Sequence, residues 1–117
     1  MVAFRLPKIY VLGDDPVFTQ TLAEFLRDLG YEAMPLYTVE DLEADAPQTA
    51  TVVVTLPETL GTDPFGRLRR IHSRLPEVTF LLIVDSDFPT REAVAYGIRN
   101  FLRQPLQLTE LERAMAG

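Results

Sequence analysis

Two hydrophobic periodicities alternate along the chain. Short runs of nearly unbroken or alternating apolar residues are separated by longer segments in which apolar residues recur every three or four positions. The short runs are typical of strands, and the longer segments are typical of helices that bury one face. The predicted strands are residues 8–13, 31–36, 51–56, 78–84 and 98–103. The predicted helices are residues 16–29, 38–45, 64–75, 89–97 and 108–115.

Helix-start and helix-stop residues mark several boundaries between these elements. Asp15 and Asp63 each precede a proline, which places a capping side chain before a residue suited to the first helical turn. Gly30 stands where a glycine commonly ends a helix. Residues 57–62 lack a clear periodicity and are predicted to form a loop.

The order of the elements predicts the fold class. Five strands alternate with five helices in 117 residues, which implies a parallel sheet with helices on both faces. We therefore expect a single α/β domain over residues 1–117, a three-layer (βα)5 sandwich of the flavodoxin-like type with strand order 2-1-3-4-5. In that order the carboxyl ends of the first, third and fourth strands meet, so Asp14, Thr55 and Asp85 are expected to lie together.

Composition narrows the chemistry. The chain has no cysteine and one histidine, His72, which excludes disulfides, cysteine nucleophiles and multi-histidine metal sites. The formal net charge of −6 argues against binding to nucleic acid. Four arginines nevertheless gather in the third predicted helix, at positions 67, 69, 70 and 74. We interpret them as a solvated helix face, with contact to a partner's acidic patch as the alternative.

The sequence also bears on location. No apolar run approaches the ~18 residues that a membrane span requires. The N-terminal residues lack the hydrophobic segment and cleavage site of a signal peptide. We therefore expect a cytoplasmic protein that makes no contact with a membrane.

Four short segments carry a resemblance to a known family: VLGDDP at 11–16, LGYE at 29–32, GTD at 61–63 and FLRQP at 101–105. Over essentially its whole length the chain resembles the receiver domains of two-component response regulators. The resemblance implies a phosphorylation pocket at the carboxyl ends of the strands. Such a pocket has two acids that hold Mg²⁺, an aspartate that accepts the phosphoryl group, a threonine or serine, and a lysine.

This chain departs from that pattern at most of the pocket positions. Gly13 falls at the first acid and Asp14 at the second, while Thr55 falls at the phosphoacceptor. The hydroxyl and lysine positions also differ. The degenerate pocket implied by the resemblance consists of Gly13, Asp14, Thr55, Asp85, Ser86 and Gln104, with Asp85 at the hydroxyl position, Ser86 beside it and Gln104 at the lysine position. Asp15 lies one residue too late to be a pocket acid and is interpreted as a helix cap.

These replacements disfavour aspartyl phosphorylation. An acyl phosphate needs a carboxylate nucleophile and a metal, whereas a threonine hydroxyl is a poor acceptor without a general base. Loss of the lysine removes a stabilising cation, and Asp85 adds negative charge where phosphoryl oxygens would lie. The leading hypothesis is therefore a pseudo-receiver, a non-enzymatic, phosphorylation-independent protein–protein interaction module in bacterial signalling.

Two alternatives remain open. The first is a flavodoxin-like domain that binds a small ligand or a divalent metal in the remodelled pocket, with oxygen ligands from Asp14 and Asp85. The second is a divergent receiver that is still phosphorylated at a non-standard residue, for which Thr55 is the candidate. The leading hypothesis requires no cofactor, and Mg²⁺ belongs to the alternatives.

The resemblance also implies an interaction surface formed by the fourth helix, the fifth strand and the fifth helix. The candidates on this surface are Tyr96, Arg99, Phe101 and Arg103, of which tyrosine and arginine are common at interface hot spots. Phe101 matches an aromatic that receivers use as a switch, but we interpret it as a permanently buried core residue. The expected partner is a signalling protein, or a second copy of this chain in a homodimer.

Overall fold

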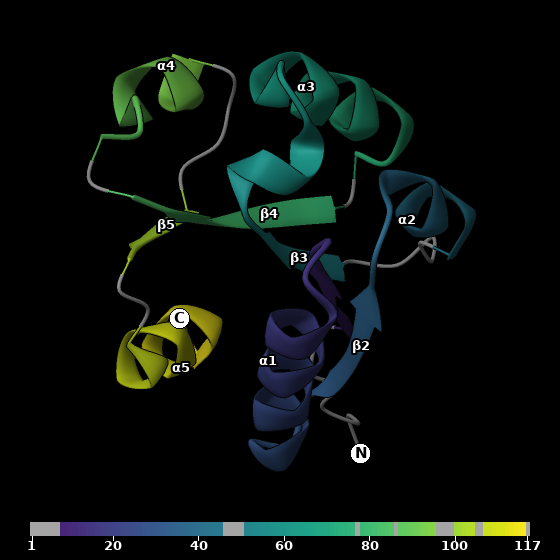
Figure 1. Cartoon of the computed structure of the whole chain (residues 1–117), viewed down its shortest axis with the longest axis vertical. Coiled ribbons are helices and arrows are strands. Elements are labelled where there is room, and N and C mark those ends of the chain that lie inside the picture. The colour runs from purple at the N-terminus through teal and green to yellow at the C-terminus, as the bar shows by residue number, and fades with distance from the viewer. Residues whose placement is uncertain are drawn as a thin grey trace, which may run out of the picture.

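Five parallel strands form the centre of the molecule (Figure 1), a computed structural model that describes residues 8–45, 51–76, 78–85, 87–95, 100–104 and 107–116. The strand order is β2-β1-β3-β4-β5, and every neighbouring pair is parallel. This confirms the predicted sheet. The strands are β1 Lys8–Leu12, β2 Glu32–Leu36, β3 Thr51–Thr55, β4 Val78–Val84 and β5 Asn100–Arg103.

Helices cover both faces of this sheet, which gives the three predicted layers. Figure 1 shows α1 and α5 on one face and α2, α3 and α4 on the other. The helices are α1 Pro16–Asp28, α2 Val39–Asp45, α3 Pro64–Arg74, α4 Thr90–Ala95 and α5 Leu108–Ala116. Within the described part of the chain, no helix has the length and apolar character needed to cross a membrane.

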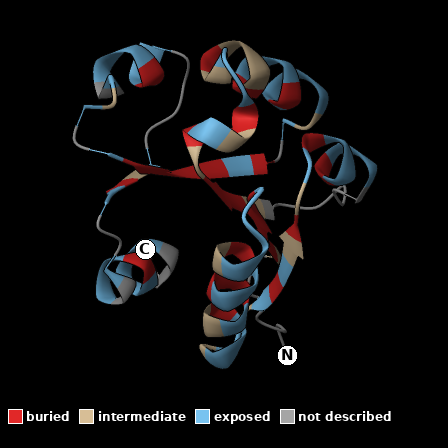
Figure 2. Cartoon of the chain, in the orientation of Figure 1, coloured by how far each residue is buried: buried red, intermediate tan, exposed pale blue. Residues whose placement is uncertain are grey.

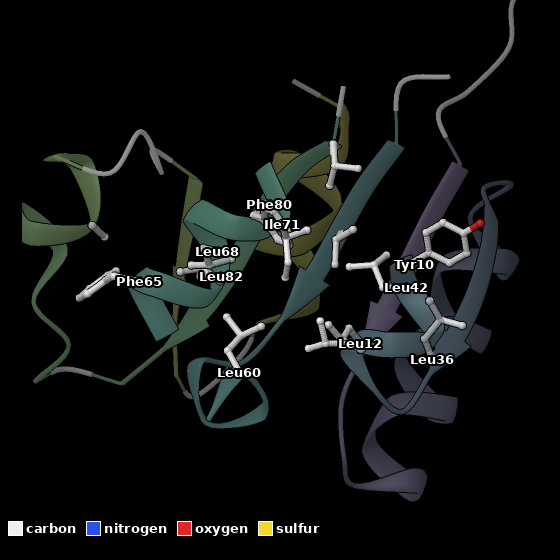
Figure 3. Close-up of a cluster of buried hydrophobic side chains, with 14 of the residues drawn as sticks. Tyr10, Leu12, Leu36, Leu42, Leu60, Phe65, Leu68, Ile71, Phe80 and Leu82 are labelled. Carbon is white, nitrogen blue, oxygen red and sulfur yellow. The ribbon is translucent and has the colours of Figure 1, made fainter. Parts of the chain in front are cut away.

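Each face of the sheet has its own hydrophobic core. In β1, Ile9 and Val11 pack toward α1 and α5, whereas Tyr10 and Leu12 pack toward the helices of the opposite face (Figure 3). Buried residues accordingly run along the strands and along the inner sides of the helices (Figure 2). The unbroken apolar run in the sequence reflects a strand that is covered on both sides.

Most of the predicted boundaries agree with the structure. The Asp15 carboxylate accepts hydrogen bonds from the backbone N–H groups of Val17 and Phe18, at 3.0 and 3.4 Å. Asp63 accepts one from the N–H of Gly66 at 3.1 Å, so both predicted caps are confirmed. Gly30 has a φ of +102°, as a helix-ending glycine should.

The predicted loop at 57–62 is wrong, because the structure has a 3₁₀ helix, η1, at Pro57–Leu60. Its apolar residues explain the difference. Pro57 and Leu60 are buried, and Leu60 joins the core on the α2–α4 face. Gly61 ends this turn with a φ of +94°, and its N–H donates to the carbonyl oxygen of Glu58 at 3.2 Å. A short turn anchored by two buried residues lacks the length needed for a visible periodicity.

Among the described residues, other strand and helix ends differ from the prediction by one residue. β1 ends at Leu12 rather than at residue 13, although the Gly13 N–H still donates to the Leu36 carbonyl oxygen at 3.0 Å. β2 begins at Glu32 rather than at residue 31. Residues 96–99, which belong to the predicted fourth helix and fifth strand, lie outside the described residues, as do residues 105–106 of the connection that follows.

Candidate functional site

The carboxyl edge of the sheet holds the residues predicted to form the degenerate pocket. Asp14 follows β1, Thr55 is the last residue of β3, and Asp85 follows β4. Because the strands are parallel, all three lie at the same edge, but their environments differ. Thr55 is 1% exposed, whereas Asp14 and Asp85 are exposed to solvent. The threonine is therefore part of the core, and the two carboxylates are at the surface.

The Thr55 hydroxyl is committed to the backbone of the neighbouring strand. Leu12 and Thr55 are paired in the β1–β3 ladder, and the Thr55 Oγ1 donates a buried 2.7 Å hydrogen bond to the Leu12 carbonyl oxygen. That is a short, favourable distance for an O–H donor. Thr55 therefore ties the ends of the two central strands together at the position where the resemblance implies a phosphoacceptor.

Gly13 lies against a side chain that sequence reasoning missed. A Cβ on Gly13 would lie 2.5 Å from the Oγ1 of Thr19 on α1. Thr19 is 0% exposed, and its hydroxyl oxygen has no hydrogen-bond partner among the described residues. Thr19 therefore occupies the space that any side chain at position 13 would need. An acid does not fit there unless Thr19 moves.

The sequence does contain a signal for Thr19. The buried positions of α1 are Thr19, Leu22, Ala23 and Leu26, a helical stripe in which the threonine is the one polar member. Phe18 and Phe25, which also belong to the apolar pattern of the sequence, are partly buried at the edge of that stripe. A polar residue at a position where the helical pattern predicts burial could therefore have drawn attention to Thr19 beside the predicted pocket.

Asp85 forms the turn that follows β4. Its carboxylate accepts a 3.1 Å hydrogen bond from the N–H of Asp87, and its carbonyl oxygen accepts one from the Arg103 guanidinium at 3.2 Å. The Gln104 N–H donates to the Val84 carbonyl oxygen at 2.7 Å, and the Gln104 side chain is exposed. Ser86, the remaining predicted pocket residue, lies outside the described residues.

The described residues do not fit a magnesium site of the kind that the resemblance implies. Among them, no group of three or more histidine, aspartate or glutamate side chains could hold a metal ion. The first acid is replaced by Gly13, where Thr19 fills the space. The Asp85 carboxylate is engaged by the Asp87 N–H.

Comparison with known proteins identifies the fold. No family model matches the chain. The chain is 27% identical over 109 residues to the transcriptional regulatory protein CrdR of Helicobacter pylori, covering 90% of this chain and 51% of CrdR. It therefore spans about half the length of this curated relative.

Two solved structures are closely similar in shape. The response regulator receiver domain protein from Clostridium thermocellum matches with a TM-score of 0.80 and 20% identity, covering 95% of this chain and 92% of that one. Full-length FixJ from B. japonicum matches with a TM-score of 0.81 and 22% identity, covering 96% and 57% respectively. The chain has the receiver-domain fold.

The structure describes two of the four residues predicted to form the interaction surface, Phe101 and Arg103, and their environments differ. Phe101 on β5 is only partly buried, and it packs against the core and against the ring of Phe88, with the ring centroids 6.3 Å apart. The structure places Phe101 against the core, as interpreted, although the residue is partly rather than completely buried because β5 is an edge strand. Arg103 is exposed but bonded to the Asp85 carbonyl oxygen. Tyr96 and Arg99 lie outside the described residues.

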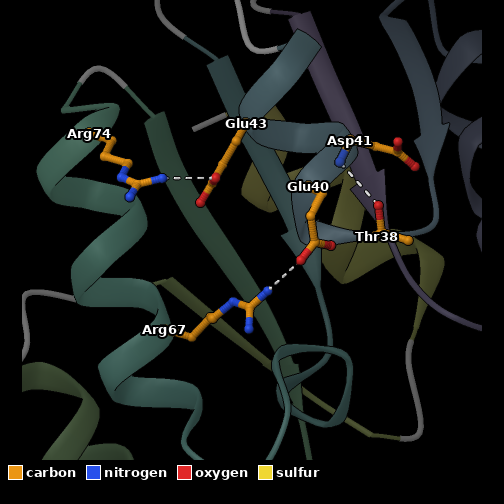
Figure 4. Close-up of polar contacts among 6 residues, drawn as sticks. All are labelled: Thr38, Glu40, Asp41, Glu43, Arg67 and Arg74. Atoms are coloured by element: carbon orange, nitrogen blue, oxygen red, sulfur yellow. Dashed lines mark hydrogen bonds and ion pairs between the residues drawn. The ribbon is translucent and has the colours of Figure 1, made fainter.

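The arginines of α3 are not simply a solvated face of the receiver fold. The Arg67 guanidinium contacts the Glu40 carboxylate on α2 at 3.2 Å, and Arg74 contacts Glu43 at 3.1 Å (Figure 4). The acidic residues that these two arginines meet belong to the neighbouring helix of the same chain, and the side chains of Arg67 and Arg74 remain 34% and 71% exposed. The predicted solvated face therefore also carries exposed ion pairs. Sequence reasoning missed this pairing of α2 with α3.

Proposed function

We propose that this chain is a pseudo-receiver, a receiver domain of bacterial two-component signalling that acts as a protein–protein interaction module without aspartyl phosphorylation. The observation that carries the proposal is Thr55. It ends β3 where the resemblance implies the phosphoacceptor, it is buried, and its hydroxyl donates to the Leu12 carbonyl oxygen at 2.7 Å. A module that keeps the fold and replaces the acceptor transmits a signal by binding.

Phosphorylation of Thr55 itself would be unfavourable in this arrangement. The hydroxyl would have to leave its bond to Leu12, and the carbonyl oxygen left behind would lose a buried partner. A nucleophilic hydroxyl also needs a base within hydrogen-bond reach, whereas the Thr55 hydroxyl contacts carbonyl oxygens of the backbone. Burial and the absence of a base among the described hydrogen-bond partners of this hydroxyl therefore both disfavour a phosphothreonine.

The remainder of the pocket supports the same proposal. The Thr19 side chain occupies the space next to position 13. The first magnesium-binding acid is therefore absent from the sequence, and the packing around Gly13 leaves no room for it. Asp85 stands at the hydroxyl position, and its negative charge would repel a phosphoryl group. Gln104 stands at the lysine position, and its neutral side chain would not stabilise the charge of a phosphoryl group. In this proposal the domain is a signalling module rather than an enzyme, and it uses no cofactor.

The binding surface in this proposal is the face of α4, β5 and α5, which includes Phe101 and Arg103. The partly buried Phe101 and the exposed Arg103 there supply an aromatic edge and a cation, types that are frequent at interfaces. A partner protein or a second copy of this chain would bind this face, and Tyr96 and Arg99 are proposed as further contacts.

The test is a set of amide NMR spectra recorded with Mg²⁺, then with Mg²⁺ and acetyl phosphate, then with Mg²⁺ and beryllofluoride. A receiver with a complete acidic pocket serves as the positive control under identical conditions. We expect the spectra of this chain to stay unchanged at Gly13, Asp14, Thr55 and Asp85, while the control shifts. Shifts at these residues with acetyl phosphate or beryllofluoride would overturn the proposal in favour of a divergent, phosphorylated receiver.

The same experiment separates the alternatives. Shifts with Mg²⁺ alone, lost in an Asp14→Asn variant, would instead favour the metal-binding domain. Shifts with acetyl phosphate that disappear in a Thr55→Val variant would place the phosphoryl group on Thr55. Intact mass after incubation with acetyl phosphate provides an independent check, because one added phosphoryl group changes the mass directly.

A further inference from the structure

An arginine-rich groove lies on the surface of α3, next to α2. It has a volume of about 750 Å³, and its charged lining includes Arg67, Arg69, Arg70 and Arg74 of α3, Glu43 of α2 and Asp63. From Pro64 to Arg74 the helix contains no acidic residue. The whole chain, by contrast, carries a formal net charge of −6. The groove is therefore a basic surface on an acidic protein.

The groove already binds carboxylates from the chain itself. Arg67 and Arg74 are two helical turns apart, about 10 Å along the axis, and each holds one glutamate of α2 (Figure 4). The side chains of the first pair, Arg67 and Glu40, are 34% and 76% exposed. Those of the second pair, Arg74 and Glu43, are 71% and 32% exposed. Ion pairs as exposed as these are weak and exchange easily with competing carboxylates.

Arg70 lies between these two arginines in the sequence of α3, and Arg69 is next to it. Both residues line the groove and are exposed. Their guanidinium groups make no hydrogen bond or ion pair with another described residue. They are thus available cations inside a groove whose other two arginines form exposed ion pairs with Glu40 and Glu43.

We propose that this α2–α3 groove binds an acidic segment of a partner protein, with Arg69 and Arg70 as the anchoring residues. A guanidinium presents a planar fork that matches a carboxylate, and the groove offers several of them in a row. The inference deepens the proposed function, since it gives the interaction module a second surface and states the chemistry of its partner. The net charge of −6 disfavours nucleic acid as the occupant.

The two glutamates of α2 then act as built-in competitors. A carboxylate of the incoming segment would exchange with Glu43 at Arg74 or with Glu40 at Arg67. Removing the glutamate charges should therefore strengthen binding, whereas removing the free arginine charges should weaken it. General attraction to a charged surface would give effects of the same signs, so the distinction comes from position: arginines inside the groove should matter more than exposed arginines elsewhere on the chain.

The experiment measures fluorescence anisotropy of the full chain with a fluorescein-labelled oligo-glutamate peptide at low salt. We expect Arg69→Gln/Arg70→Gln to weaken binding by roughly threefold to tenfold, as the loss of two exposed ion pairs implies. We expect Glu40→Gln/Glu43→Gln to strengthen it by a similar factor. The matched control is Arg27→Gln/Arg91→Gln, which removes two exposed arginines from α1 and α4, and it should change the affinity by less than about twofold.

Equal weakening by the control variant would overturn the proposal, and so would an unchanged affinity in the Arg69/Arg70 variant. Tighter binding of a single-stranded DNA of matched charge, with the same dependence on Arg69 and Arg70, would assign the groove to nucleic acid instead. Circular dichroism verifies that each variant is folded. None of these outcomes depends on acetyl phosphate, so failure here leaves the phosphorylation test of the proposed function intact.

Discussion

The Oγ1 of Thr19 lies 2.5 Å from the place that a Cβ on Gly13 would occupy. Real Cβ atoms do not approach other atoms so closely, so these two positions are coupled by packing. Gly13 does not have a positive φ, which means that its backbone would accept any residue. A side chain at position 13 would therefore conflict with the Thr19 Oγ1, which must move before a Cβ fits. Packing alone therefore keeps a side chain out of this part of the pocket.

The first prediction follows from this contact. Gly13→Ala should destabilise the domain by about 1 to 3 kcal/mol, the usual cost of forcing an extra carbon into a packed core. Thr19→Ala removes the Oγ1 and leaves the Thr19 Cβ at 3.7 Å, an ordinary contact distance. In the Thr19→Ala background, Gly13→Ala should be neutral or should stabilise the domain by about 0.4 to 1 kcal/mol, because alanine lowers the conformational entropy of the unfolded chain. Urea unfolding of the four proteins measures the coupling.

Thr21→Ala provides the control for that cycle, because Thr21 is exposed on the same helix. Its combination with Gly13→Ala should be additive within about 0.5 kcal/mol. If Gly13→Ala had the same effect in the wild-type chain and in the Thr19→Ala variant, Thr19 would not be what excludes side chains from position 13.

The second prediction concerns the bond between Thr55 and Leu12. Thr55→Val keeps the shape of the side chain but removes the buried donor, so it should cost about 1 to 2 kcal/mol. Thr79→Val, an exposed position on β4, should change the free energy of unfolding by less than about 0.5 kcal/mol. Chemical denaturation measures both. A neutral Thr55→Val variant would mean that the bond of this hydroxyl to Leu12 does not stabilise the core.

The sequence predicts this fold well because its strongest patterns come from burial. The apolar run of β1 reflects a strand that is covered on both faces. The Asp-Pro pairs at 15–16 and 63–64 each reflect a helix capped by the aspartate. The alternation of elements predicts the parallel sheet, and five strands in a chain of this length fit the flavodoxin-like strand order, which is confirmed. Local causes of this kind are visible in a single sequence.

The site was less predictable because its features join distant segments. The position of Thr55 at the end of β3 was predictable, but its bond to Leu12 depends on the β1–β3 register. The contact of Gly13 with Thr19 depends on where α1 packs against the sheet. Likewise, the pairing of Arg67 with Glu40 depends on side chains that reach across two helices. None of these contacts produces a repeating pattern of residues that could be recognised in the sequence.

The third prediction separates two adjacent acids. Asp15 caps α1 through the N–H groups of Val17 and Phe18, so Asp15→Ala should destabilise the domain by about 0.5 to 2 kcal/mol. Asp15→Asn, which retains the acceptor oxygen, should restore most of that loss. Asp14→Ala is the matched control at the neighbouring exposed position and should be nearly neutral. Thermal unfolding distinguishes the variants, and equal destabilisation by Asp14→Ala would contradict the separate roles assigned to them.

The last prediction concerns an aromatic link across the α4 side of the sheet. Phe88, in the turn after β4, has ring centroid distances of 5.6 Å to Phe65 on α3 and 6.3 Å to Phe101 on β5. Aromatic pairs contribute about 0.5 to 1.5 kcal/mol beyond their buried area. The costs of Phe88→Leu and Phe101→Leu should therefore be non-additive, with the double variant losing less than the sum because the pair is already broken.

Phe25 supplies the control for this cycle. It is partly buried on α1, in the core of the opposite face, so Phe25→Leu and Phe88→Leu should add within about 0.5 kcal/mol. Urea unfolding of the single and double variants measures both couplings. A coupling between Phe88 and Phe101 above that level would mean that β5 and the turn after β4 are joined energetically, so a partner bound at Phe101 would alter the stability of that turn. Additivity for the Phe88–Phe101 pair would mean that the rings pack independently and that such a signal stops at β5.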